Sequence, residues 1–216
     1  MESPVHTTPL PAPTAAPSTG AVASPAGRPA TTTATRSAKL VISGGFGVGK
    51  TTFVRAVSEI VPLSTEASMT AAAAVQDDAG DVDTKTSTTV AMDFGRLAIG
   101  DEVVLYLFGT PGQQRFAFMW DQVALGALGA IILLDTARLA DSHAAIDYFE
   151  SRRIPFVVAA NGFAHSPVGS ADQIRQALTL GAGVPVVQVD ARDRQSVKQA
   201  LIALVEHLLA LRHAAR

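Results

Sequence analysis

A glycine-rich loop constrains this chain more than any other feature of its sequence. Residues 44–51 read GGFGVGKT and match the pattern GxxxxGK[ST] at every position. The apolar run Lys39–Ser43 precedes the loop, and a helical pattern that Pro62 ends follows it. In a strand–loop–helix of this kind, backbone N–H groups and the helix N-terminus face a phosphate. The sequence therefore predicts an α/β domain that binds a nucleoside phosphate.

The loop residues also have individual roles in phosphate chemistry. Lys50 is expected to reach the β- and γ-phosphates, where it also assists catalysis, and the Thr51 hydroxyl is expected to bind Mg²⁺. The predicted cofactor is therefore Mg²⁺. We expect the following residues to contact the nucleotide: Gly44, Gly45, Phe46, Gly47, Val48, Gly49, Lys50, Thr51 and Thr52.

Composition divides the chain into a tail and one domain. Seven of the 12 prolines lie in the first 29 residues, among Ala, Thr and Ser. Such a segment has too few large apolar groups to offset the entropy of ordering. We expect residues 1–37 to be a disordered Pro/Ala/Thr-rich tail and residues 38–216 to be the phosphate-binding domain.

Charge and cysteine content exclude several functions. The formal net charge of −2 gives no electrostatic footprint for nucleic acid. The chain has no cysteine, so disulfides, thiolate metal sites and thiol catalysis are excluded. We find no signal peptide and no apolar run long enough to cross a bilayer, and we expect a cytoplasmic protein without membrane insertion.

After the tail, short apolar runs alternate with helical patterns, as in an α/β domain. We predict a six-stranded, mostly parallel sheet flanked by about five helices. Gly100–Asp101 joins two of the strands as an antiparallel edge hairpin, and Ser170 with Gln173 forms a capping box at one helix start. The predicted strands are Lys39–Ser43, Thr89–Ile99, Glu102–Phe108, Gly129–Asp135, Pro155–Asn161 and Val184–Val189. One helix is predicted to begin near Gly49. Three others are predicted over Ser142–Ser151, Ala171–Leu180 and Gln195–Leu211.

Four further motifs resemble those of Ras-like GTPases. Thr88–Phe94 (TTVAMDF) is similar to the end of switch I, and Gly109–Phe116 (GTPGQQRF) to the DxxGQ motif of switch II. Asn161–Ala164 (NGFA) and Asp190–Arg192 (DAR) stand where the NKxD and SAK guanine motifs belong. The phrases GGFGVGKTTFV, TTVAMDFG, LYLFGTPGQQRF and DYFESR resemble, more narrowly, the small GTPases of actinobacterial conservon operons. These are relatives of the gliding-motility GTPases.

This resemblance implies a small GTP-binding protein that acts as a molecular switch and hydrolyses GTP slowly. Switch I (63–89) and switch II (109–120) would change state between the GTP and GDP forms. Thr89, with Thr88 a close second, would bind Mg²⁺ together with Thr51. Gly112 would donate its N–H to the γ-phosphate, and Gln113 would orient the attacking water. The implied base-binding residues are Asn161, Phe163, Asp190, Ala191 and Arg192.

The resemblance also implies partners. It suggests a Roadblock-type regulator and a sensor-kinase-like membrane protein, which would recruit the chain peripherally to the inner face of the membrane.

The chain departs from the family pattern at several positions. Gly109 replaces the DxxG aspartate, for which Asp135 is a candidate substitute. Phe46 replaces a glycine and crowds the space that an arginine finger would enter. The lysine and the guanine-reading acid of NKxD are Gly162 and Ala164. These changes leave an alternative open: a hydrolysis-deficient nucleotide-binding scaffold with relaxed base specificity.

Overall fold

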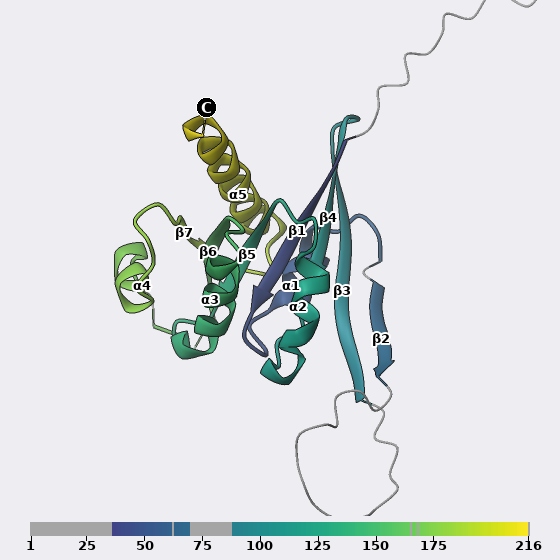
Figure 1. Ribbon diagram of the computed structural model, residues 1–216, viewed down its shortest axis with the longest axis horizontal. Coiled ribbons are helices and arrows are strands. Elements are labelled where there is room, and N and C mark those ends of the chain that lie inside the picture. The colour runs from purple at the N-terminus through teal and green to yellow at the C-terminus, as the bar shows by residue number, and fades with distance from the viewer. Residues whose placement is uncertain (1–35, 62, 70–87, 165, 168, 216) are drawn as a thin grey trace, which may run out of the picture. The chain divides into compact units, whose positions relative to one another are not determined.

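The computed structural model describes residues 36–61, 63–69, 88–164, 166–167 and 169–215. Strands and helices alternate along most of this chain (Figure 1). The strands are β1 (Arg36–Gly44), β2 (Leu63–Met69), β3 (Thr88–Ile99), β4 (Val103–Gly109), β5 (Gly129–Leu134), β6 (Phe156–Asn161) and β7 (Val186–Val189). The α-helices are α1 (Lys50–Val57), α2 (Trp120–Ala124), α3 (His143–Ser151), α4 (Ala171–Ala177) and α5 (Arg194–Ala214), and two short 3₁₀ helices are η1 (Gln114–Met119) and η2 (Leu139–Ser142).

The strands form one mixed sheet in the order β2-β3-β4-β1-β5-β6-β7. Neighbouring strands from β4 to β7 are parallel, whereas β3 is antiparallel to both β4 and β2. The carboxyl ends of β1, β5, β6 and β7 therefore meet at one edge of the sheet. Open α/β sheets bind their ligands at this edge.

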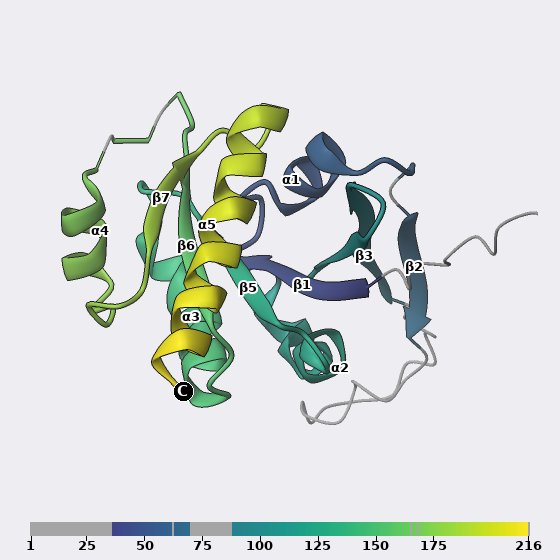
Figure 2. The same cartoon turned by 90° about the horizontal axis from the view of Figure 1, so that it is seen from above.

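Helices cover both faces of the sheet, because alternate residues of each central strand point to opposite faces. Leu40 and Ile42 of β1 are buried in one apolar cluster with residues of α1 and α5. Val41, between them, is buried in a second cluster with residues of α2, α3 and α4. Figure 2 shows α1 and α5 on one side of the sheet and α2 and α3 on the other.

The predicted α/β fold with an antiparallel edge is confirmed, but the predicted strand number is one too low. Residues 63–87 have no apolar period in sequence, yet Leu63–Met69 pairs with β3 along its whole length, from Phe94 back to Thr88. An edge strand is held by backbone hydrogen bonds to a single neighbour, and natural edge strands avoid a long apolar pattern. The apolar periodicity of the sequence therefore does not reveal β2.

Several predicted boundaries also move. Strand β1 starts at Arg36 rather than Lys39, because the Arg36 N–H donates to the Glu102 carbonyl at 2.7 Å. Residues 36 and 37 are therefore strand and not tail, and residues 1–35 of the predicted tail lie outside the described residues. Helix α1 ends at Val57, before Pro62. The capping box at the start of α4 is confirmed.

None of the helices in the described part of the chain has both the length and the hydropathy needed to cross a bilayer.

Candidate functional site

The glycine-rich loop lies at the carboxyl edge of the sheet, between the end of β1 and the start of α1. Gly44 has a φ of 134°, and a Cβ there would lie 2.2 Å from the Leu133 carbonyl oxygen. Gly49 caps α1 with a φ of 102°, and its Cβ would lie 2.8 Å from Nδ2 of Asn161. Only glycine fits at these two positions. The predicted strand–loop–helix arrangement is thus confirmed.

The Lys50 side chain is buried under this loop. Its Nζ donates to the carbonyl oxygens of Gly44 at 2.9 Å and Gly45 at 2.7 Å. Burial lowers the pKa of Lys50 to about 8, and the nearby Asp93 carboxylate partly opposes this shift. A buried ammonium that donates to two carbonyl oxygens attracts an anion, because a phosphate would stabilise its charge.

A pocket of about 360 Å³ opens above Lys50. It collects predicted nucleotide-binding residues from both the loop and switch II. Three lining residues were not among those predicted: Asp93, Thr110 and Pro111. The predicted residues that line the pocket are Phe46, Gly47, Val48, Gly49, Lys50, Thr51, Thr52 and Gly112.

Asp93 of β3 faces the residue predicted to bind the metal. The Thr51 hydroxyl donates to Oδ2 of Asp93 at 2.6 Å. Asp93 also packs against Gly109, which stands at the position of the aspartate in the Ras-like DxxG pattern, since a Cβ on Gly109 would lie 3.0 Å from the Asp93 Cβ. A carboxylate therefore lies beside Thr51, contributed by the neighbouring strand.

Asp135, the candidate substitute from the sequence, has other partners at the end of β5. Its carboxylate accepts hydrogen bonds from the Ala137 N–H at 2.9 Å, from Nε of Arg138 at 3.3 Å and from the Ser166 hydroxyl. It organises the loop that leads to α3. Asp93 is the carboxylate that contacts Thr51.

The switch II segment packs against the phosphate pocket through its backbone. Gly112 lies so close to Lys50 that a Cβ there would be 2.5 Å from Nζ. The indole N–H of Trp120 donates to the Pro111 carbonyl at 3.2 Å. The Gln113 side chain accepts a hydrogen bond from Nε of Arg115 at 2.8 Å. The predicted catalytic amide is therefore paired with a neighbouring arginine in this conformation.

Thr89, the second predicted metal ligand, lies in strand β3, where its backbone is opposite Ser68 of β2. It lies four positions before Asp93 along the strand, which corresponds to about 13 Å at the rise of an extended chain. The structure does not bring Thr89 to Thr51 in this conformation.

A second pocket, of about 500 Å³, shares the lining residues Gly47, Gly49 and Thr52 with the first. It is bounded by the glycine-rich loop, by the segment after β6 and by the segment after β7. The lining includes all five predicted base-binding residues, and one of them, Asn161, is the last residue of β6. The lining residues are Gly47, Gly49, Thr52, Asn161, Gly162, Phe163, Ala164, Asp190, Ala191 and Arg192.

Asn161 connects the three walls of this second pocket. Its side chain is buried, with 5% of the residue exposed. Its Nδ2 donates to the Val48 carbonyl at 3.0 Å, and its Oδ1 accepts from the Ala191 N–H at 3.0 Å. One amide thus fixes the phosphate loop relative to the segment after β7.

Asp190 and Arg192 form a fork at the rim of the second pocket. The Arg192 side chain donates from Nε to Oδ1 of Asp190 at 2.9 Å and from Nη2 to Oδ2 at 2.8 Å, and its backbone N–H donates to Oδ1 at 2.9 Å. These hydrogen bonds lower the pKa of Asp190 to about 2. The carboxylate is thus ionised at neutral pH.

Of the predicted loop residues, those from Phe46 to Thr52 line the first pocket, whereas Gly44 and Gly45 line neither pocket. The predicted base-binding residues line the second pocket, and Asp93 was not predicted. The predicted two-residue turn would pair Ile99 with Glu102 and would bring residue 93 opposite residue 108. The structure instead pairs Ile99 with Val103, and counting back along both strands brings residue 93 opposite residue 109. Gly109, which has no side chain, and Asp93 are thus opposite one another on paired strands.

We predict that Asn161→Ala lowers the free energy of unfolding by about 2–4 kcal/mol, because the buried Val48 carbonyl and the buried Ala191 N–H each lose their hydrogen bond to Asn161. Urea denaturation followed by the fluorescence of the single tryptophan, Trp120, measures this. Gln188→Ala is the control, because Gln188 donates one exposed hydrogen bond, to the Gly169 carbonyl at 3.0 Å. A loss no larger than that of the control would contradict the role given to Asn161.

Comparison with known proteins places the chain in a family. It is 32% identical over 125 residues to an uncharacterized protein of Methanocaldococcus jannaschii, in an alignment that covers 57% of this chain and 68% of the relative. A family model described as "conserved hypothetical ATP binding protein" matches residues 42–211. That match extends from the end of β1 into α5 and includes both pockets. The chain belongs to this family of P-loop nucleotide-binding proteins.

Proposed function

We propose that the chain is a Mg²⁺-dependent switch that binds guanine nucleotides and hydrolyses GTP slowly. The observation that carries the proposal is the contact between Thr51 and Asp93 in the pocket above Lys50. This pocket combines a phosphate-binding cation with two oxygen groups of the kind that Mg²⁺ prefers.

The residues present fit Mg²⁺. The Thr51 hydroxyl and the Asp93 carboxylate are hard oxygen donors 2.6 Å apart in one pocket. In the described part of the chain, no group of three or more His, Cys, Asp or Glu side chains could hold a metal. Mg²⁺ in nucleotide sites needs no such cage, because it is held by one or two protein groups, phosphate oxygens and water. When bound, it would neutralise charge on the β- and γ-phosphates.

Hydrolysis in this conformation should be slow. Gln113 is paired with Arg115, so its amide must first leave that hydrogen bond before it can orient a water. Phe46, 66% exposed at the pocket, stands where an activating arginine would approach. An arginine supplied by a partner accelerates such reactions by about 10³–10⁵-fold. Any activator of this chain must use a different route of approach.

The switching segments follow from the same geometry. Gly112 lies against Lys50, and Trp120 is hydrogen-bonded to Pro111. A γ-phosphate that drew the Gly112 N–H toward it would move this segment. Thr89 would reach the metal only if the pairing of β2 with β3 opened. The similarity to conservon GTPases adds a proposed setting in bacterial signalling, with a Roadblock-type regulator and a sensor-kinase-like membrane protein as partners.

A second candidate function is a nucleotide-binding scaffold that hydrolyses little and accepts adenine as well as guanine. Ala164 favours it, because the side chain of this exposed residue offers no acceptor to a base. The description of the family as ATP-binding also favours it. A single-turnover hydrolysis assay with GTP and ATP separates the two candidates.

We predict that Asp93→Asn removes most of the gain in GDP affinity that Mg²⁺ provides. The variant keeps an acceptor for Thr51 but loses the charge, and a charged hydrogen bond is worth about 1.5–3 kcal/mol. Calorimetry with and without EDTA should show a Mg²⁺-dependent gain about 10–100-fold smaller in the variant. Binding in EDTA should change by less than about threefold, since Lys50 and the loop remain.

Asp101→Asn is the matched control for this variant. Asp101 is an exposed carboxylate in the turn at the opposite end of the same hairpin. It should leave the Mg²⁺ dependence intact. An Asp93→Asn variant with the full wild-type Mg²⁺ dependence would show that Asp93 does not serve the metal.

The lowered pKa of Lys50 predicts a pH dependence of binding. Free Lys50 has a pKa of about 8, and a bound phosphate raises it, so binding takes up a proton at higher pH. The association constant for GDP should be flat below about pH 8 and should fall above it by up to about tenfold per pH unit. Calorimetry across this range measures it. Lys50→Met should bind weakly with no such slope; an equal slope in that variant would assign the proton to another group.

A further inference from the structure

The proposed base pocket lacks an acid in the segment after β6 but has one in the segment after β7. Ala164 stands at the position of the guanine-reading aspartate, and it lines the same pocket as Asp190. The side chain of Asp190 is 40% exposed, so a base can reach it. The two positions belong to neighbouring segments, because the Gly162 N–H donates to the Val189 carbonyl at 2.9 Å.

Asp190 is held on a rigid frame. Its backbone N–H donates to the Ser196 hydroxyl at 2.9 Å. The next residue, Ala191, is 2% exposed and donates to Asn161. Asn161 in turn is bound to the phosphate loop. The position of the Asp190 backbone is therefore fixed relative to the place where the phosphates of a nucleotide would lie.

Arg192 keeps this carboxylate ionised and occupied. Arg192 makes a bidentate side-chain pair and one backbone N–H hydrogen bond with Asp190, and the arginine side chain is 77% exposed. Exposed ion pairs contribute little to stability. A ligand with its own donors can therefore share or replace the Arg192 side chain at little cost.

The chemistry of the bases decides which ligand suits a carboxylate. Guanine presents two adjacent donors, N1–H and the N2 amine, which match the two oxygens of one carboxylate. Adenine presents a donor at N6 beside an acceptor at N1, and the N1 lone pair repels a carboxylate. An anionic acceptor at this rim therefore selects guanine over adenine.

We propose that the side chain of Asp190 is the base-reading group of this protein and selects guanine in place of the acid missing at Ala164. This inference rests on the proposed nucleotide-binding function and adds the origin of its base specificity. The reading carboxylate has moved from the segment after β6 to the segment after β7. Arg192 is its partner while no base is bound.

Asp190→Asn tests the proposal, because it should weaken the preference for GDP and strengthen the binding of xanthosine diphosphate. The amide keeps the shape and offers one acceptor and one donor. Xanthine carries a carbonyl where guanine carries its amine, so it matches the amide with its N1–H and its C2 carbonyl. In calorimetric titrations with Mg²⁺, wild-type protein should bind GDP at least about tenfold more tightly than ADP or xanthosine diphosphate. The variant should lose that preference for GDP and bind xanthosine diphosphate about tenfold more tightly than wild type.

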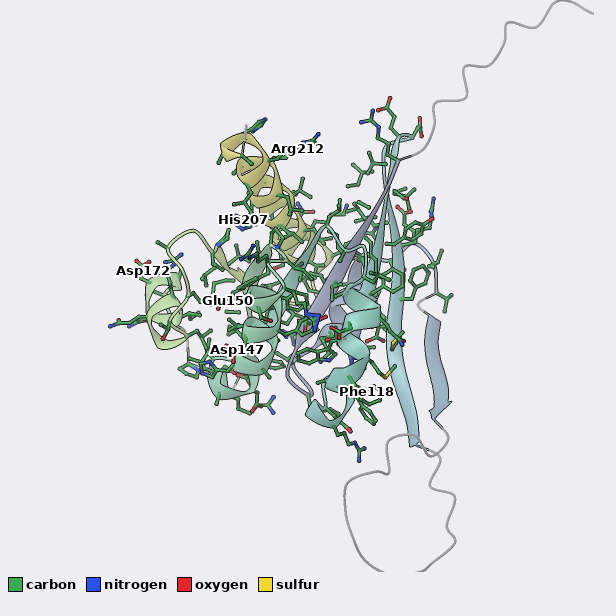
Figure 3. The ribbon with its side chains drawn as sticks, viewed as in Figure 1. Phe118, Asp147, Glu150, Asp172, His207 and Arg212 are labelled. Carbon is green, nitrogen blue, oxygen red and sulfur yellow. The ribbon has the colours of Figure 1, made fainter. Side chains whose placement is uncertain are left out.

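Two further variants control the experiment. Asp172→Asn breaks a comparable surface pair, with Arg175 at 2.6 Å on α4, outside the base pocket (Figure 3). It should leave all three affinities unchanged. Ala164→Asp combined with Asp190→Asn returns an acid to the pocket and should restore the preference for GDP.

The outcomes separate the two claims. If wild-type protein binds none of the nucleotides, the proposed function itself is wrong. If wild-type protein binds GDP and ADP equally, or if Asp190→Asn keeps the wild-type preference without a gain for xanthosine diphosphate, nucleotide binding stands and the base-reading role of Asp190 is overturned.

Discussion

The buried amide of Asn161 is the interaction on which the geometry of the site depends. The phosphate loop follows β1, Asn161 ends β6, and Ala191 follows β7, and these parallel strands end at one edge of the sheet. By bonding to Val48 on one side and to Ala191 on the other, one side chain sets the distance between the two pockets. Because a nucleotide has a fixed length, that distance decides whether its phosphates and its base can both be held.

Around this frame, the charges that the motifs lack are found on adjacent elements. At the proposed metal site, Gly109 stands at the DxxG position of the Ras-like pattern, and Asp93 on the paired strand contacts Thr51. At the proposed base site, Ala164 stands at the position of the guanine-reading acid, and Asp190 on the next segment lines the same pocket. A carboxylate acts through its position in space, so a neighbouring strand or loop can supply it. Empty motif positions are therefore weak evidence that such a site is inactive.

The sequence predicts the parts of the structure that local chemistry specifies. The GxxxxGK[ST] pattern locates the phosphate loop, and the Ser170–Gln173 box locates the start of α4. Strand β2 escapes prediction because an edge strand shows no apolar period. Asp93 escapes because its role comes from a cross-strand contact with Gly109, which no local pattern records. Strand β2 and the role of Asp93 both depend on pairing between strands, which motif matching does not detect.

A crystal structure of the wild-type protein with GDP and Mg²⁺ would show the positions of metal and base together. We expect a metal bound by the Thr51 hydroxyl on the Asp93 side of the phosphates, with the guanine N1–N2 edge facing the Asp190 carboxylate. A metal on a different set of residues, together with a base edge that faces Ala164 and contacts only water, would contradict this expectation.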